Sequence, residues 1–241
     1  MVLPPELIDE ILFYLRHDKL TLLKCSLVAK SWAYRSQKLL FNWHLHFTGG
    51  KTFRMWRETA SQTNFESLEY VRSITCSEFD SLDDFHGNHL KSFHRLQHIT
   101  LHLVVSTRSD LANSLPASQN TLSSLHLSDV TLYNTAIVNL INHFPNLSQL
   151  HIDHCTFRWH GWDAPSPSRS PSGKLRLTGL GVEDMKALFS CLSNLELEYD
   201  ELEFVDFPSA FLRDNVYVPS IVYACGHALA RLELCSFTCK P

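Results

Sequence analysis

The chain has 241 residues, of which 44% are hydrophobic and 19% charged, proportions typical of a globular protein with a substantial core. A formal net charge of -4 and a pI of about 6.4 argue against a general binder of nucleic acid or of anionic membranes, so we expect neither as a partner. The sequence contains no run of eighteen apolar residues and no basic segment leading into a hydrophobic one, so we expect an intracellular protein, cytoplasmic, nuclear or both.

The first predicted elements lie in the run 3–41, LPPELIDEILFYLRHDKLTLLKCSLVAKSWAYRSQKLLF. Apolar residues with helical spacing occur over 7–15 and again over 20–28, with a break at His17 and Asp18, and a third group follows, so we expect three short helices. About 40 residues seldom bury a core without metal, disulfides or a neighbour. The surplus of apolar residues therefore favours a docking module, with an N-terminal cap on the next domain as the alternative.

The order and spacing of LPPELIDEIL, the pair Leu22 and Leu23, CSLVAKSW and KLLF resemble an F-box of the kind common in basidiomycete fungi, from Leu3 to about Phe47. In that family the module binds the Skp adaptor of a cullin-RING ubiquitin ligase. The resemblance therefore implies a Skp adaptor and, through it, a cullin as partners. By motif position, the residues implied to form the adaptor-binding surface and the core beneath it are Leu3, Pro4, Leu7, Ile8, Ile11, Leu12, Leu15, Leu23, Val28 and Trp32.

The remaining chain begins with a predicted strand, WHLHF, and a predicted helix, KTFRMWRETASQ, and then becomes repetitive. A six-residue pattern with apolar residues at its first, fourth and sixth positions recurs. Its copies start at Val71, Leu96, Leu122 and Leu147, at intervals of 25, 26 and 25 residues. Further copies, one of them degenerate, are Leu175-Leu177, Leu192-Leu195-Leu197 and Leu229-Leu232-Leu234. The segments between copies that predict helices are SDLANSL, TAIVNLINHF, VEDMKALFSCL and PSIVYACGHAL.

Each strand with its helix must stack on its neighbours to bury an apolar face. The pattern resembles the leucine-rich repeat over about Tyr70 to Phe237, without the usual asparagine after the strand. The predicted fold class is therefore α/β: a three-helix F-box module over 1–47, then a divergent leucine-rich-repeat-like solenoid of alternating strands and helices over 48–241. The Pro/Ser-rich insert 159–174 predicts a disordered loop, with Ser166-Pro167 and Ser170-Pro171 as candidate phosphorylation sites.

The sequence contains no phosphate-binding glycine motif, nucleophile elbow or H-E-x-x-H pattern, so we expect no catalytic residue, no cofactor and no enzymatic activity. Seven scattered cysteines without a C-x-x-C pair predict reduced thiols.

Histidine stands out, with fourteen copies. In strand register His126 and His151 are neighbours at about 4.8 Å, whereas two histidines of one strand are about 13 Å apart and cannot share a metal. Protein recognition by this polar face is the main interpretation, and a metal or pH-sensing role is the alternative. Residues 183–206 contain eight acidic residues and one lysine, which predicts a basic target. The candidate target-binding residues are His98, His102, His126, His151, Glu196, Glu198 and Glu233.

The last copy runs into CSFTCKP, with Phe237 apolar and no polar helix to cap the stack, so we expect an open strand edge that self-associates. The expected function is that of a substrate receptor of a Skp–cullin–F-box ubiquitin ligase, which holds an unknown target protein near the ubiquitin-conjugating enzyme. The alternatives are an adaptor-bound scaffold without a role in ubiquitination, and a metal-binding enzyme that uses the histidine face.

Overall fold

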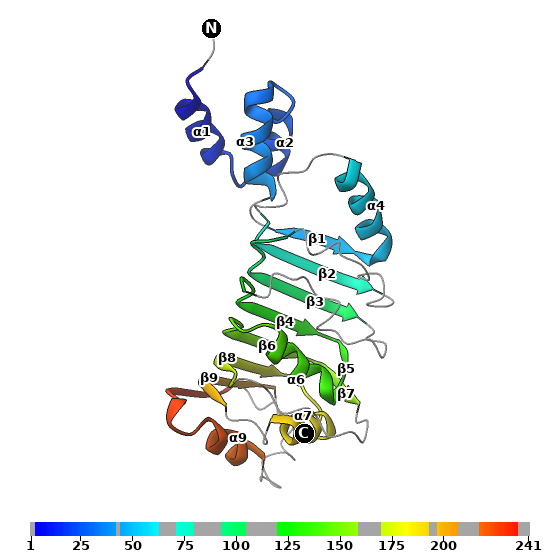
Figure 1. Cartoon of the computed structure of the whole chain (residues 1–241), viewed down its shortest axis with the longest axis vertical. Coiled ribbons are helices and arrows are strands. Elements are labelled where there is room, and N and C mark those ends of the chain that lie inside the picture. The colour runs from blue at the N-terminus through cyan, green and yellow to red at the C-terminus, as the bar shows by residue number, and fades with distance from the viewer. Residues whose placement is uncertain are drawn as a thin grey trace.

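The computed structural model describes residues 3–41, 44–62, 71–79, 93–104, 120–158, 170–192, 197–206 and 217–235. Over these ranges the protein is mixed α/β, with seven α-helices and an eight-stranded parallel sheet (Figure 1). The helices are α1 (Pro5–Tyr14), α2 (Lys19–Cys25), α3 (Lys30–Phe41), α4 (Gly49–Gln62), α6 (Asn134–His143), α7 (Val182–Leu192) and α9 (Tyr217–Cys225), and a 3-10 turn, η4 (Gly226–Ala228), follows α9. None of these helices is long and apolar enough to cross a membrane.

The strands of the large sheet follow one another in chain order, and every pair is parallel. A second, two-stranded sheet joins β5 (Thr131–Tyr133) to β7 (Thr156–Arg158) and lies outside the predicted pattern. The strands of the large sheet are β1 (Leu45–Thr48), β2 (Ser73–Phe79), β3 (His98–Val104), β4 (Ser124–Ser128), β6 (Gln149–Asp153), β8 (Ser172–Thr178), β9 (Glu198–Val205) and β10 (Arg231–Cys235).

The three N-terminal helices enclose a small core of their own. Pro4 is the N-cap of α1 and Pro5 its first residue, positions where a missing backbone donor costs nothing. The Asp18 side chain caps α2 by accepting a hydrogen bond from the Thr21 amide at 3.0 Å. The Arg35 guanidinium ties α3 to α1, with 2.6 Å contacts to Asp9 and to the Pro5 carbonyl. The core residues are Ile8, Leu12, Leu22 and Cys25, with Leu15, Trp32, Leu39 and Leu40 packed against them.

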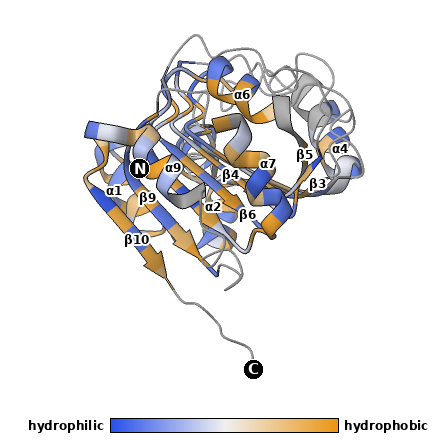
Figure 2. Cartoon of the chain, turned by 90° about the horizontal axis from the view of Figure 1, so that it is seen from below, coloured by the Kyte–Doolittle hydropathy of each residue, from blue (hydrophilic) through white to orange (hydrophobic). Residues whose placement is uncertain are grey.

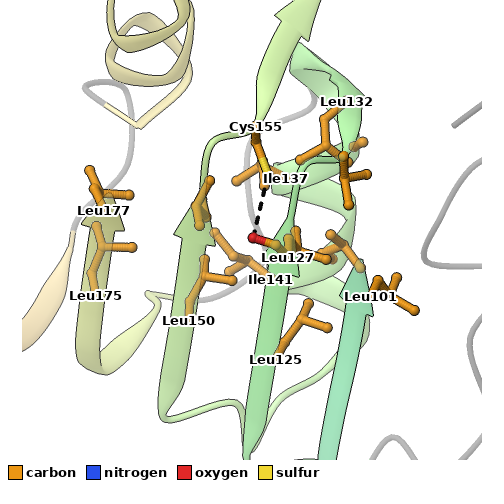
Figure 3. Close-up of a cluster of buried hydrophobic side chains, with 14 of the residues drawn as sticks. Leu101, Leu125, Leu127, Leu132, Ile137, Ile141, Leu150, Cys155, Leu175 and Leu177 are labelled. Atoms are coloured by element: carbon orange, nitrogen blue, oxygen red, sulfur yellow. Dashed lines mark hydrogen bonds between the residues drawn. The ribbon is translucent and has the colours of Figure 1, made fainter. Parts of the chain in front are cut away.

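The large sheet buries one face in a second, separate core. Alternate residues of each strand point to this face, so in-register residues stack in rows from strand to strand (Figure 3). Cys155, from the turn before β7, reaches into the core, where its thiol donates to the Leu127 carbonyl at 3.4 Å. The first row is Ile74, Ile99, Leu125, Leu150, Leu175 and Leu202, and the second is Cys76, Leu101, Leu127, Ile152, Leu177 and Phe204.

A residue with positive φ follows the same register position of seven successive strands. From Asp129 onward its amide donates to a carbonyl at the end of the next strand, for example His154 to Thr178 at 2.9 Å. The repeated turn therefore uses backbone geometry, and only two of the seven positions carry glycine. They are Gly49, Glu78, Leu103, Asp129, His154, Gly179 and Asp206, with φ between 48° and 72°.

The structure agrees with the predicted repeat from β2 to β8 and corrects it afterwards. The predicted strand Leu192-Leu195-Leu197 is wrong, because α7 continues to Leu192 and β9 pairs with β8 through Leu202 and Phe204. The predicted boundary at Phe47 falls within β1, which pairs with β2, and Phe47 is buried in the core of the sheet. The predicted helix 109–115, most of the insert 159–174 and Phe237 lie outside the described residues.

Candidate functional site

The three N-terminal helices expose an unusual number of large apolar side chains. Of fifteen such exposed residues described in the whole chain, ten lie between Leu3 and Tyr34, whereas only four apolar residues of this unit are buried. Single exposed apolar residues are common on protein surfaces, but a concentration of this kind marks an interaction surface. The ten are Leu3, Leu7, Ile11, Phe13, Tyr14, Leu20, Leu23, Leu27, Val28 and Tyr34.

Helix α1 carries two apolar faces, and only one of them is used internally. Ile8 and Leu12, one turn apart, are buried against the other helices, whereas Leu7 and Ile11, displaced by one position, are 46% and 39% exposed. Leu12 is fully buried, so it packs beneath the exposed face of α1. Of the ten predicted adaptor-binding residues, Leu3, Pro4, Leu7, Ile11, Leu23 and Val28 are exposed, and Ile8, Leu12, Leu15 and Trp32 form or flank the core.

A groove of about 310 Å³ lies between α1 and α3. Phe13 and Leu39 supply apolar lining, and the Asp9–Arg35 ion pair lies along it. Sequence reasoning did not single out this groove, because its lining comes from two helices whose packing angle the pattern does not specify.

The opposite face of the large sheet presents the polar residues that alternate with the buried rows. The middle row crosses the sheet as His46, Thr75, Thr100, His126, His151, Arg176, Glu203 and Glu233. It therefore divides into a histidine half, from β1 to β6, and a charged half, from β8 to β10.

The predicted neighbours His126 and His151 do lie side by side, with ring centroids 4.1 Å apart and planes 7° from parallel. Partial burial is the main cause, and the neighbouring His126 imidazole the second, of a pKa of His151 lowered to about 4. Burial also lowers the pKa of His126. Both rings are therefore neutral at pH 7. His151 Nε2 lies 3.2 Å from the Thr178 hydroxyl, whereas the buried Nε2 of His126 has no hydrogen-bond partner among the described residues.

Two other histidines of this half, His46 and His102, contact hydroxyls of the next strand. His102 Nδ1 lies 3.1 Å from Ser128 Oγ and 3.4 Å from an Asp129 carboxylate oxygen, and His46 Nε2 lies 3.0 Å from Ser77 Oγ. His98 is exposed on the same strand as His102. These bonds hold the rings in defined positions on a half-buried polar surface.

The charged half is an ion-pair network with balanced charge. Lys174 Nζ lies 2.9 Å from Glu203 and 3.6 Å from Glu201, and Arg176 Nε lies 3.4 Å from Glu203. The hydrogen bond from Lys174 is the main cause of the lowered pKa of Glu203, and the same bond raises the pKa of Lys174. Three cations, Lys174, Arg176 and Arg231, thus face three carboxylates, Glu201, Glu203 and Glu233.

The predicted acidic target-binding residues need correction. Glu203 occupies the register position, opposite Arg176, that the repeat pattern assigned to Glu196, and Val205 occupies the one assigned to Glu198, because the strand starts later than predicted. Glu196 lies outside the described residues, and Glu198 is exposed at the first position of β9. Glu233 lies on the polar face as predicted, but it forms an ion pair with Arg231. Glu201, Glu203 and Glu233 are engaged in ion pairs, and a basic target stays a prediction.

One group of described side chains could supply three metal ligands. Ligand atoms of Glu203, Glu233 and Cys235 all lie within 4.8 Å of one another. Both carboxylates already form ion pairs with arginine, and Glu203 also with Lys174, so a cation would have to displace these contacts. His126 and His151 belong to no such group of three among the described residues.

Comparison with models of known protein families gives no match for this sequence. A comparison with curated proteins gives no significant match either.

Proposed function

We propose that this protein is a substrate receptor of a Skp–cullin–F-box ubiquitin ligase, in which α1 to α3 form an F-box and the sheet forms a leucine-rich-repeat-like domain that binds the target. The observation that carries the proposal is the concentration of exposed large apolar residues in the three N-terminal helices, which hold ten of the fifteen found among the described residues. Such a surface is costly to leave in water and is stabilised by a partner with a matching apolar groove.

The motif order LPPELIDEIL, CSLVAKSW and KLLF supports an F-box for these helices. Leu7 and Ile11 of α1 and Leu23 of α2 are the contact residues in this proposal, and Ile8 and Leu12 hold the helices together beneath them. The separate cores of the helical unit and the sheet support two functional parts in one chain.

The sheet supports a binding role because its polar face is broad, half-buried and preorganised. Stacked imidazoles and ion pairs fix its side chains, which reduces the entropy lost when a protein binds. The receptor contributes proximity, because ubiquitin transfer requires only that a target lysine be held near the charged thioester. No residue of this chain takes a catalytic role in the proposal.

Co-expression with a tagged fungal Skp adaptor tests the proposal. We expect the two proteins to elute together as a stable complex in equimolar amounts. Elution of a folded chain without the adaptor would overturn the F-box assignment.

The scaffold alternative shares the adaptor surface, so adaptor binding does not separate the two functions. A target that co-purifies with the chain, supplied to a reconstituted ligase, should acquire ubiquitin only if the chain is a receptor. A captured target that stays unmodified while a control substrate of the same ligase is modified would favour the scaffold.

A further inference from the structure

The last strand of the sheet, β10, exposes apolar surface that its neighbours bury. Leu232 and Leu234 are 42% and 47% exposed, whereas their register partners on β9, Leu202 and Phe204, are almost fully buried. Within the described part of the chain, β10 pairs only with β9. Figure 2, which views the molecule from this end, shows β10 at its periphery.

The backbone of β10 offers hydrogen-bonding groups on the same open side. The Asp206 amide donates to the Cys235 carbonyl at 3.3 Å, so Cys235 directs its backbone groups at β9. Backbone groups alternate in direction along a strand. The amide and carbonyl groups of Arg231 and Glu233 therefore also point toward β9, whereas those of Leu232 and Leu234 point away from it. An edge of this kind is a template for another strand.

We propose that β10 pairs in antiparallel fashion with β10 of a second copy of this chain, about a two-fold axis at Leu232. In this register the two Leu232 residues exchange their outward amide and carbonyl groups. Arg231 of each copy then lies directly opposite Glu233 of the other, at the positions where side chains of antiparallel strands come closest. Two ion pairs form on the polar face, and the two Leu232 side chains meet on the apolar face.

Charge selects this register over the nearest alternatives. A shift that places Leu232 opposite Leu234 brings Glu233 face to face with Glu233 of the other copy, and like charges directly opposite are destabilising. Registers that place Leu232 opposite Arg231 or Glu233 of the other copy are also disfavoured. The outward backbone groups of Leu232 would then face residues whose own backbone groups are already directed at β9.

The same two-fold pairing joins the two sheets edge to edge with their polar faces on the same side. A self-complementary contact of this kind closes after two copies, whereas β10 pairing with β1 of the next copy would build open chains. The self-association therefore ends at a dimer.

Sedimentation velocity of the whole chain at tens of micromolar tests the proposal. We expect a concentration-dependent monomer–dimer equilibrium. Arg231→Glu and Glu233→Arg, each alone, place like charges opposite one another and should raise the dimer Kd at least about ten-fold. The double exchange Arg231→Glu/Glu233→Arg restores opposite charges and should restore the dimer, which also excludes misfolding as the cause of the single effects.

A mixture of the two single variants provides a second readout. One copy then carries two acidic and the other two basic residues, so the mixed dimer should form in preference to either homodimer. A wild-type monomer at every concentration, open polymers, or a dimer that neither single reversal weakens would overturn the proposal. None of these outcomes bears on adaptor binding, so the proposed function is tested separately.

Discussion

The exposed face of α1 allows a quantitative test of the proposed adaptor surface. Leu7 and Ile11 retain 46% and 39% of their surface in water. Complete burial of such a side chain contributes about 1.5–3 kcal/mol, so covering the remaining surface of both would contribute about 1.3–2.6 kcal/mol. The double variant Leu7→Ala/Ile11→Ala should therefore bind the adaptor roughly ten- to seventy-fold more weakly, because about 1.4 kcal/mol corresponds to a factor of ten.

Isothermal titration calorimetry with purified adaptor measures the change, and circular dichroism verifies that the variant is folded. Leu103→Ala is the matched control, because Leu103 is a leucine of nearly equal exposure, 47%, at the end of β3. It should leave adaptor affinity unchanged. Leu12→Ala instead removes a fully buried side chain and should lower the free energy of unfolding by about 2–5 kcal/mol. A folded double variant with wild-type affinity would refute α1 as the contact.

Three further predictions concern the sheet. Gly173→Ala should lower the free energy of unfolding by at least about 2 kcal/mol in urea denaturation, because φ is +92° and a Cβ would overlap the Ser148 carbonyl; a neutral effect would contradict this backbone. Leu103→Asn should raise the free energy of unfolding by about 0.5–1 kcal/mol, because φ of Leu103 is +51° and asparagine tolerates the left-handed region better than leucine. A lower free energy of unfolding would refute the argument. The pKa of His151 is about 4 in the native state instead of 6.5, so the native state binds fewer protons than the unfolded state between these values, and the free energy of unfolding should fall as pH decreases from 6.5 to 4. His151→Gln should flatten this fall. An unchanged pH profile of the variant would contradict the prediction.

Much of the repeat is determined by sequence alone. A strand that buries one face must alternate, so the pattern starting at Val71, Leu96, Leu122 and Leu147 specifies both the strands and the face that each buries. In-register stacking follows from the near-constant spacing of the copies, and it correctly paired His126 with His151.

Tertiary structure decided what local patterns leave open. Between α7 and the end of β9 the sequence contains two equivalent apolar pairs, Leu195-Leu197 and Leu202-Phe204, and over the described residues β8 pairs with the second. The choice depends on where α7 ends and on the shift in register at Gly173, neither of which the alternation of apolar residues encodes. The pairing of Glu203 with Lys174 follows from that choice.

The same limit applies to the helices. Helical periodicity marks Leu7, Ile8, Ile11 and Leu12 alike as apolar, because residues one apart in sequence lie about 100° apart on a wide stripe. Only packing against α2 and α3 buries Ile8 and Leu12 and leaves Leu7 and Ile11 in water. Burial likewise sets the pKa of His151, since the energy of a charged imidazole depends on the surroundings that neighbouring strands supply. Sequence therefore specifies which residues can be buried, and tertiary packing specifies which of them are.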